Sequence, residues 1–355
     1  MKVSSRILSI VCFLFLVVSC AENSDGEEFG TDIINDDEPI EEIVQKIGLE
    51  DFYSGEIKWD KATGTVTFMT SGKIFFPSEG LIGFIWNVPT KVKQIIIKEN
   101  VTVDGAFHTF SDCTISGENR KTSILYGLEE QAWANNNNLT AYKISSIECH
   151  NGTLTVSNLT SLNPRSFHVR GNAGAIHLKD ADFIDNRGGH HNHSDGIAAG
   201  DGSTVDNCYF ETGDDVIKVY SDITVTNTTI KMVQNAVPIQ LGWGNYSDGA
   251  VGTFKNLKII GDSGRGNPDQ SNPIICGRTG KYAVTLNIDG LIIDNPTASM
   301  VNLFDDNNDG VYEKTVKGTL KNVQISNIRR YSNQLKGNDE LKIFDTEGKE
   351  ISKDF

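Results

Sequence analysis

The chain has 355 residues, of which 34 are glycine and 38% are hydrophobic, and its formal net charge at pH 7 is −15. This composition favours short strands joined by polar turns over long helices, and the length suffices for one large β domain. The acidic balance and the lack of a basic stripe exclude nucleic acid as the expected partner and disfavour other polyanions.

The N-terminus has the pattern of an export signal. Two basic residues precede an apolar stretch over 7–18 that is too short to cross a bilayer as a helix. The end of this stretch, up to Ser19-Cys20, resembles the lipobox of bacterial lipoproteins. We therefore expect residues 1–19 to be a signal peptide and Cys20 to carry a lipid that anchors an extracytoplasmic protein to the outer membrane. Ordinary signal cleavage is the alternative.

An acidic segment follows. Ten acidic and no basic residues lie between residues 21 and 45, which predicts a flexible, solvated tether over 20–47. Its start at 24–28 resembles the acidic tag that directs some lipoproteins to the cell surface, and a plain spacer is the alternative. Alternating apolar residues over 48–106 then predict an N-terminal β cap or the first coils of a domain that fills 107–355.

Four cysteines lie beyond the signal and the anchor, and none has the spacing of a zinc or redox motif. We expect them to be small buried side chains. They are Cys113, Cys149, Cys208 and Cys276.

A repeat is visible from about residue 150. An apolar residue and one variable residue are followed by Asn, Asp or Gly and then by further apolar residues, at intervals of 20 to 34 residues. Unequal intervals indicate loops of different length on a constant coil. The repeated polar or glycine positions are Asn158, Asp180, Asn207, Asn227, Asn256, Gly290 and Asn322.

The repeat predicts a solenoid whose short strands pair with the coils above and below. At each bend a small residue tolerates left-handed backbone angles, and stacked Asn side chains can hydrogen-bond to one another. The expected fold class is all-β, a right-handed single-stranded parallel β-helix, with the hand taken from the general crossover preference. A β-sandwich is the alternative, but it leaves the repeated turn chemistry unexplained.

Acidic residues stand at the entrances of two successive strands. Asp195 precedes Ile197 by two residues, and Asp215, directly after Asp214, precedes Ile217 by two. In stacked parallel strands such equivalent residues lie about 4.8 Å apart. If Asp215 belongs to the strand, side-chain alternation places it inside the coil. A buried carboxylate without a partner is costly, so we expect Asp215 to lie in the loop before the strand. Like charges are crowded in this way mainly where chemistry needs them.

Paired carboxylates suit the hydrolysis of glycosidic bonds. Inversion needs one carboxylic acid to protonate the leaving oxygen and another carboxylate to activate water, at a separation of roughly 6.5–9.5 Å. We assign Asp214 as the general acid, with its pKa raised by neighbouring charge, and Asp195 and Asp215 as the pair that holds and deprotonates the water. The alternative is that all three are turn residues.

These segments resemble those of known enzymes. Residues 195–197 and 213–215 resemble the shared signature of the β-helical glycoside hydrolases with the pectin-lyase-like fold, polygalacturonases among them. The run 214–220, with 236–243 one coil later, is closer to the dextranase family, which hydrolyses α-1,6-glucan with inversion. The resemblance covers about 160–330. It implies that the catalytic acids are Asp195, Asp214 and Asp215.

The resemblance also implies a neutral polysaccharide or oligosaccharide substrate. The segment 242–245 takes the place of the polygalacturonase segment that carries a groove His, and the Arg-x-Lys tripeptide that grips uronates is missing. We therefore expect an α-glucan such as dextran, with α-1,3-glucan kept open. Further alternatives are a pectin hydrolase, a polysaccharide lyase on the same fold, and a non-catalytic surface glycan-binding lipoprotein.

Several side chains near the acids are candidates for substrate binding. Trp243 either offers an aromatic face to a sugar or caps the core. Lys218 either binds a substrate hydroxyl, acts as a counter-charge to Asp214 and Asp215, or is simply solvated. His168, one coil before Asp195, either lines the cleft or is a buried structural histidine. The candidate set is Lys218, Tyr220, Trp243, Asn245, His168 and His193.

No organic cofactor is implied. The histidines of 190–193 are interpreted as a loop at the edge of the cleft rather than as a metal site. Asp305, Asn307 and Asp309 match the first half of a calcium loop, but Val316 stands where its bidentate Glu belongs. A solvated turn is expected there, with Ca²⁺ as the alternative. We expect a monomer that contacts the membrane through its lipid anchor alone.

Overall fold

The computed structural model describes residues 46–77, 83–129, 144–171, 174–187, 194–233, 236–241, 247–262, 272–278, 283–304, 316–332 and 339–355. Gln45–Phe355 form one compact unit, and its described residues form strands and turns. Within these ranges no helix has both the length and the apolar character that crossing a bilayer requires.

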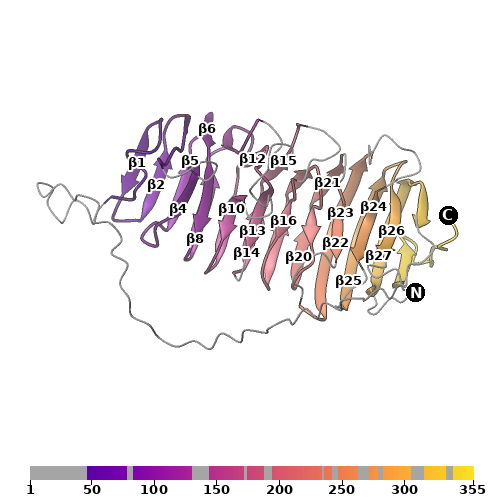
Figure 1. Ribbon diagram of the computed structural model, residues 1–355. Helices are drawn as coiled ribbons and strands as arrows, with labels where there is room; N and C mark the ends of the chain where they lie inside the picture. The colour runs from indigo at the N-terminus through magenta and orange to yellow at the C-terminus, as the bar shows by residue number, and fades with distance from the viewer. Residues whose placement is uncertain are drawn as a thin grey trace, which may run out of the picture. The chain divides into compact units, whose positions relative to one another are not determined.

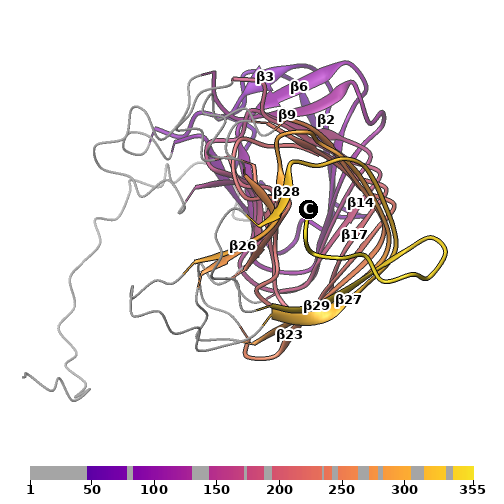
Figure 2. The same ribbon diagram turned by 90° about the vertical axis from the view of Figure 1, so that its right-hand side faces the viewer.

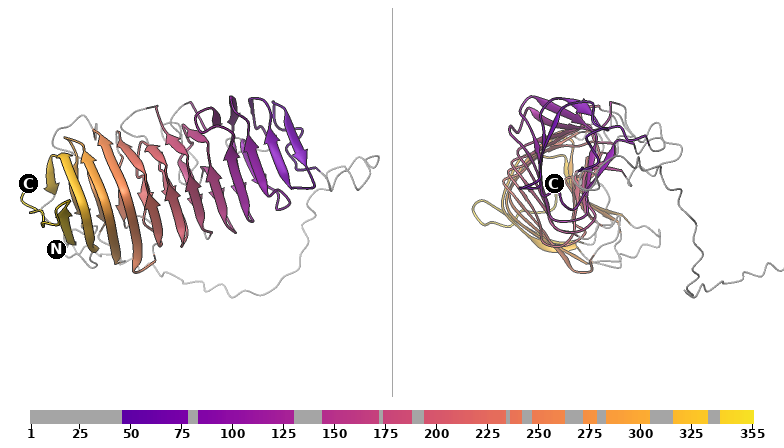
Figure 3. Two further views of the ribbon diagram at one scale, coloured as in Figure 1. Left: turned by 180° about the vertical axis from the view of Figure 1, so that it is seen from behind. Right: turned by 90° about the vertical axis from the view of Figure 1, so that its left-hand side faces the viewer.

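Strands of successive coils stack in parallel along this unit (Figures 1 and 3). The larger sheet contains two ladders. The first runs through β2 (Thr65–Phe68), β5 (Gln94–Ile97), β8 (Cys113–Gly117), β11 (Leu154–Ser157), β14 (Ile176–Lys179), β17 (Ser203–Asp206), β20 (Ile223–Thr226), β23 (Ala250–Gly261), β25 (Val284–Asp294), β27 (Val316–Asn327) and β29 (Asp339–Asp345).

The second ladder of the larger sheet lies across the bend from the first. It runs through β3 (Gly72–Lys73), β6 (Val101–Asp104), β9 (Ser123–Tyr126), β12 (Thr160–Leu162), β15 (Asp182–Ile184), β18 (Tyr209–Glu211) and β21 (Thr229–Met232). It then joins the first ladder, because β23 continues through the bend and pairs with both β20 and β21. In the described residues, β1 (Ile57–Asp60) differs from the rest by pairing antiparallel, with β2.

A smaller sheet closes each coil and carries the candidate site. Its strands are β4 (Ile85–Val88), β7 (Ala106–Thr109), β10 (Ser145–Cys149), β13 (Phe167–Gly171), β16 (Ile197–Ala198), β19 (Ile217–Lys218), β22 (Ile239–Leu241), β24 (Pro273–Arg278), β26 (Ser299–Phe304) and β28 (Arg330–Ser332). Each pairs in parallel with its neighbour in this order. The strands of successive coils overlie one another when viewed along the stack (Figure 2). The predicted parallel β-helix is confirmed.

The repeated polar positions are the bends of the coil. The six Asn and Asp positions predicted from the repeat have φ between 50° and 55°, and Gly290 has φ 82°. Their side chains also link coils, because Asn207 Nδ2 donates to Asp180 Oδ1 at 2.6 Å and Asn256 Nδ2 donates to Asn227 Oδ1 at 2.9 Å. Asn therefore has two roles at these bends. It tolerates left-handed backbone angles, and its side chain hydrogen-bonds to the equivalent residue of the next coil.

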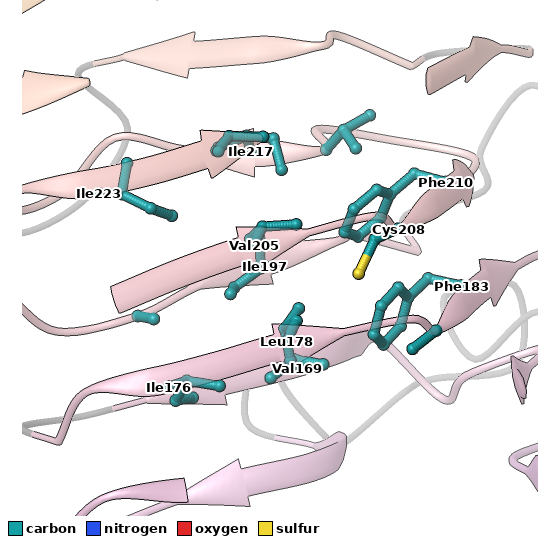
Figure 4. Packing of buried hydrophobic residues seen from close by; sticks show 14 of the residues in the cluster. Val169, Ile176, Leu178, Phe183, Ile197, Val205, Cys208, Phe210, Ile217 and Ile223 are labelled. Atoms are coloured by element: carbon teal, nitrogen blue, oxygen red, sulfur yellow. The ribbon is translucent and has the colours of Figure 1, made fainter. Parts of the chain in front are cut away.

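The interior is built from aligned apolar columns. Phe183 of β15 and Phe210 of β18 pair in register and stack with their ring centroids 4.8 Å apart (Figure 4). Val169, Ile197 and Ile217 form a corresponding column from the smaller sheet. The four cysteines expected to be buried are free and buried, as predicted.

Apart from the antiparallel β1, the strands within 48–106 belong to the same ladders as the rest. β2 and β5 begin the first ladder, and β4 pairs with β7, which pairs with β10. The N-terminal strands are thus coils of the same β-helix. Residues 1–45, which include Cys20, lie outside the described residues.

Candidate functional site

The acids lie at the starts of two adjacent strands of the smaller sheet. Ile197 of β16 pairs in register with Ile217 of β19, and the Gly196 amide donates to the Asp215 carbonyl at 2.8 Å. Since each acid precedes its isoleucine by two residues, Asp195 and Asp215 occupy the same position in adjacent coils.

A corner in the backbone turns these carboxylates outward. Val216 and Ile217 are consecutive, yet both side chains are fully buried in the core. Simple strand alternation would send one of them out, so the chain bends between Asp215 and β19. Asp215 is consequently half-buried rather than sealed in the interior. This resolves the parity conflict that the sequence poses.

The three acids form one group, here called the acid cluster (Asp195, Asp214 and Asp215). One carboxylate oxygen from each lies within 4.8 Å of the others. Asp195 is buried, while Asp214 and Asp215 are half-buried. Three carboxylates this close cannot all ionise without a compensating positive charge.

Hydrogen bonds from the neighbouring coil fix the Asp214 loop. The Gly213 amide donates to Ser194 Oγ at 2.8 Å, and the Asp214 amide donates to the Ser194 carbonyl at 3.2 Å. The Asp215 amide donates to Asp214 Oδ1 at 3.0 Å. Ser194 therefore ties the second acidic segment to the first. Ser194 is not among the site residues predicted from the sequence, although its position directly before Asp195 places it close to the acids.

Lys218 supplies the compensating charge. Its Nζ lies 2.7 Å from Asp215 Oδ2 and 3.3 Å from Asp195 Oδ1, and its side chain is only 6% exposed. Of the roles considered for Lys218, the solvated one is wrong, and the counter-charge acts on Asp195 and Asp215. The ring of Phe167, which occupies the position of Asp195 one coil earlier, has its centroid 5.4 Å from the same Nζ.

Protonation of the cluster follows from burial and charge. Burial raises the pKa of Asp195 well above the ordinary aspartate range, with Lys218 opposing this and the other two acids adding to it. Burial works against the charged form of Lys218, but Asp195 and Asp215 outweigh it, and the pKa of the ammonium is raised. The acid cluster thus retains a proton that isolated aspartates would lose. The raised pKa is that of Asp195, and burial is its main cause.

Gly196 is required by the close approach of two coils. A Cβ at this position would lie 2.3 Å from the Val216 carbonyl oxygen and 3.0 Å from its carbonyl carbon. Any side chain there would push β16 away from β19 and separate Asp195 from Asp215. The Asp-Gly pair is therefore a steric requirement of the site rather than a generic turn.

The acid spacing differs from the separation of roughly 6.5–9.5 Å expected for two carboxylates of an inverting hydrolase. Here the nearest oxygens are within 4.8 Å. That distance also suits a bound cation, but the Lys218 ammonium already lies against two of the three carboxylates. The arrangement can hold a proton, a water molecule and a sugar hydroxyl at one place.

Tyr220 and His168 differ in their relation to the site. Tyr220 is half-buried beside Lys218, and burial raises the pKa of its hydroxyl while the ammonium opposes the rise. His168 is fully buried, with Nδ1 2.8 Å from Ser161 Oγ and its ring edge-on to Phe183. His168 does not line the cleft, because its position is the inward one at the corner, and its buried Nε2 has no hydrogen-bond partner among the described residues, as a satisfied structural histidine would have.

The remaining predicted site residues lie outside the described residues. They are His193, Trp243, Asn245, Asp305, Asn307 and Asp309.

The chain shows distant similarity to known proteins. No family model matches the chain. Dextranases from Arthrobacter sp. (strain CB-8) and Arthrobacter globiformis are 28% and 27% identical to it over 173 residues, which is 44% of this chain and 27% of each relative. The chain thus matches about a quarter of their length.

A solved structure shares the fold. Dex49A from Penicillium minioluteum superposes with a TM-score of 0.52 at 16% identity, covering 83% of this chain and 54% of that one. Over 44% of its length, the chain is a distant homologue of the dextranases, and its strands form a parallel β-helix.

Proposed function

We propose that the protein is an inverting glycoside hydrolase that cleaves a neutral polysaccharide, an α-glucan of the dextran type. The observation that carries this proposal is the acid cluster, with three carboxylate oxygens within 4.8 Å of one another beside a buried ammonium. Such crowding costs folding free energy and is typical of a site that moves protons.

The three acids divide the work through their different surroundings. Lys218 contacts Asp195 and Asp215 and opposes the rise that burial causes in the pKa of Asp195, so the ionised carboxylate of this pair can hold and deprotonate a water molecule. Asp214 is half-buried, so its carboxyl group can reach a glycosidic oxygen. It donates its proton to that oxygen as the bond to the anomeric carbon breaks, while the water attacks from the opposite face.

The charge of the acid cluster and the similarity to dextranases both support a neutral glucan as the substrate. Among the described residues, the buried cation in contact with the acid cluster is Lys218, and it is already paired with two carboxylates. In this described part of the site, a uronate would add negative charge that Lys218 does not offset. A neutral glucan adds none, and the relatives that match over 173 residues are named dextranases.

Activity on a panel of glucans tests the function. The protein is incubated with α-1,6-glucan, α-1,3-glucan and pectate, and the newly released anomer is followed by NMR. Release of the β-anomer from an α-glucan is expected. Release of the α-anomer would mean retention and would contradict the inverting mechanism. Unsaturated products would instead identify a lyase.

We further propose that a lipid on Cys20 anchors the enzyme to the outer membrane, facing outward. The support is the sequence pattern that ends at Cys20 and the acidic segment after it. A Cys20→Ser variant should lose incorporation of labelled fatty acid and leave the membrane fraction. Unchanged fractionation would contradict the anchor.

A further inference from the structure

A second group of titratable side chains lies on the outward face of the same sheet. His108 of β7 pairs in register with Glu148 of β10, and His150 follows β10 directly. One ligand atom from each of these three residues, here called the His–Glu–His cluster, lies within 4.8 Å of the others. His108 and Glu148 are buried and His150 is half-buried.

The separations match those around a transition metal ion. His150 Nε2 lies 3.4 Å from His108 Nδ1 and 3.6 Å from Glu148 Oε1. A tetrahedral ion with bonds of about 2.0–2.1 Å to each ligand separates the ligand atoms by roughly 3.3 Å. For these two pairs of atoms, small side-chain rotations suffice to reach the spacing around one ion, and one ligand atom of each residue already lies within 4.8 Å of the others.

The imidazoles are held in the orientation that a metal requires. His108 Nε2 lies 3.2 Å from the Ser145 carbonyl oxygen, which only an N–H can satisfy, so the lone pair is on Nδ1 and faces His150. Such a bond from the outer nitrogen to a carbonyl is the usual support of a ligating histidine. Phe110 stacks on His150, with centroids 4.6 Å apart and an interplanar angle of 3°.

We propose that His108, Glu148 and His150 bind a divalent transition metal ion such as Zn²⁺, with the two imidazoles and the carboxylate as protein ligands. Two nitrogen ligands select against Ca²⁺ and Mg²⁺, which take oxygen ligands. Arg170 Nε lies 3.8 Å from Glu148 Oε1 and orients that carboxylate.

The His–Glu–His cluster lies apart from the acid cluster. Glu148, Arg170, Ala198 and Lys218 are successive register partners, so Glu148 is three strands from Lys218, or about 14 Å along the stack. The ion would join β7 to β10 and stabilise these coils without touching the acid cluster. The proposal is independent of the hydrolase proposal, since it predicts metal binding whatever the enzyme cleaves.

Metal binding to the full chain tests the proposal. Chelator-treated protein is titrated with Zn²⁺, Ca²⁺ and Mg²⁺ by calorimetry. One equivalent of Zn²⁺ should bind more tightly than either of the other ions and raise the melting temperature. His150→Ala and Glu148→Gln should each weaken Zn²⁺ binding by more than the roughly 10–100-fold that loss of an outer-shell partner costs.

Two controls separate this site from other histidines. His177→Ala removes a half-buried histidine that contacts Thr204 on the larger sheet, and it should bind Zn²⁺ normally. A variant with His190, His191 and His193 all replaced by Ala should also retain binding. Loss of binding in either control, equal affinity for Ca²⁺, or no binding to the wild-type chain would overturn the proposal.

The visible absorption spectrum of the wild-type protein tests the proposed ligands without any substitution. Wild-type protein loaded with Co²⁺ should show the intense visible bands of a low-coordinate site with nitrogen ligands. The weak spectrum of octahedral, hydrated Co²⁺ would contradict the proposed ligands.

Discussion

Lys218 and Asp195 are brought within 3.3 Å by the pairing of two coils, although 22 residues separate them in the chain. The same ammonium lies 2.7 Å from Asp215 on its own coil. One buried cation thus spans the two rungs that carry the acids, and the protonation of the cluster depends on it.

Replacing Lys218 should change the pH dependence of hydrolysis. In Lys218→Met, Asp195 and Asp215 lose the charge that favours ionisation, so the acidic limb of kcat/KM should move to higher pH by roughly 1–3 units. Activity at neutral pH should fall accordingly. The pH–rate profile measures this. Lys231→Met, which breaks the 2.8 Å pair with Glu211 on the larger sheet, should leave the profile unchanged. An unshifted profile in Lys218→Met would refute the counter-charge role.

Replacing Asp214 should affect substrates according to their leaving groups. Asp214→Asn removes the proton donor, and kcat on the polysaccharide should fall by about 10²–10⁴. An aryl glycoside with an acidic phenol needs no protonation, so its cleavage should fall far less. Asp195→Asn and Asp215→Asn should lose both activities.

A turn aspartate provides the matched control for these variants. Asp180→Asn places the residue preferred at these bends at φ 53° and should keep full activity. If Asp214→Asn impairs both substrates equally, or stays active on the polysaccharide, the assignment of the general acid fails.

The sequence predicts the coil well because its bends have their own chemistry. Left-handed backbone angles restrict a position to Asn, Asp or Gly, so Asn158 and Gly290 stand out against a background of ordinary strand residues. The pairing of Asp195 with Asp215 was predictable for the same reason, since bends set the register of each coil.

Contacts across coils were not predictable in the same way. His108 and Glu148 are 40 residues apart, and only the register of β7 with β10 brings them together. The role of His168 stayed open for the same reason, because a strand pattern does not show the corner that turns Val216 and its equivalent inward. Loop length and backbone corners carry no periodic signal.

Adding a methyl group at Gly196 should disrupt the site. The new Cβ would meet the Val216 carbonyl oxygen at 2.3 Å, so β16 and β19 must separate. We expect Gly196→Ala to lower kcat by on the order of 100-fold, in line with the effect of a 1 Å misplacement. Gly202→Ala, where no atom lies within 4 Å but φ is 78°, should lose stability and retain kcat in the folded fraction. Equal kcat for both variants would contradict this steric account.

The stacked Asn residues at the bends of the coil should contribute to stability in two ways, through their tolerance of left-handed backbone angles and through their side-chain hydrogen bonds. Asn227 has φ 50° and accepts a hydrogen bond from Asn256 at 2.9 Å. Asn227→Ala should lower the free energy of unfolding by about 1–2 kcal/mol, because alanine is strained at this angle. Asn227→Gly relieves the strain and should cost less, because both variants lose the same side-chain hydrogen bonds to Asn256 and Asp206. Denaturant unfolding measures both losses, and a loss for Gly as large as that for Ala would contradict the strain at this bend.

Buried His168 should make the protein sensitive to acid. Burial lowers its pKa to about 3, whereas an unfolded histidine titrates near 6.5. The unfolded state therefore binds a proton first as pH falls below 6.5, and the free energy of unfolding should drop by about 1.4 kcal/mol per pH unit from this group until about pH 3. His168→Gln removes the titration, so the difference in unfolding free energy between wild type and variant should shrink with that slope. Parallel curves for wild type and His168→Gln would mean that the folded protein binds the proton as readily as the unfolded chain.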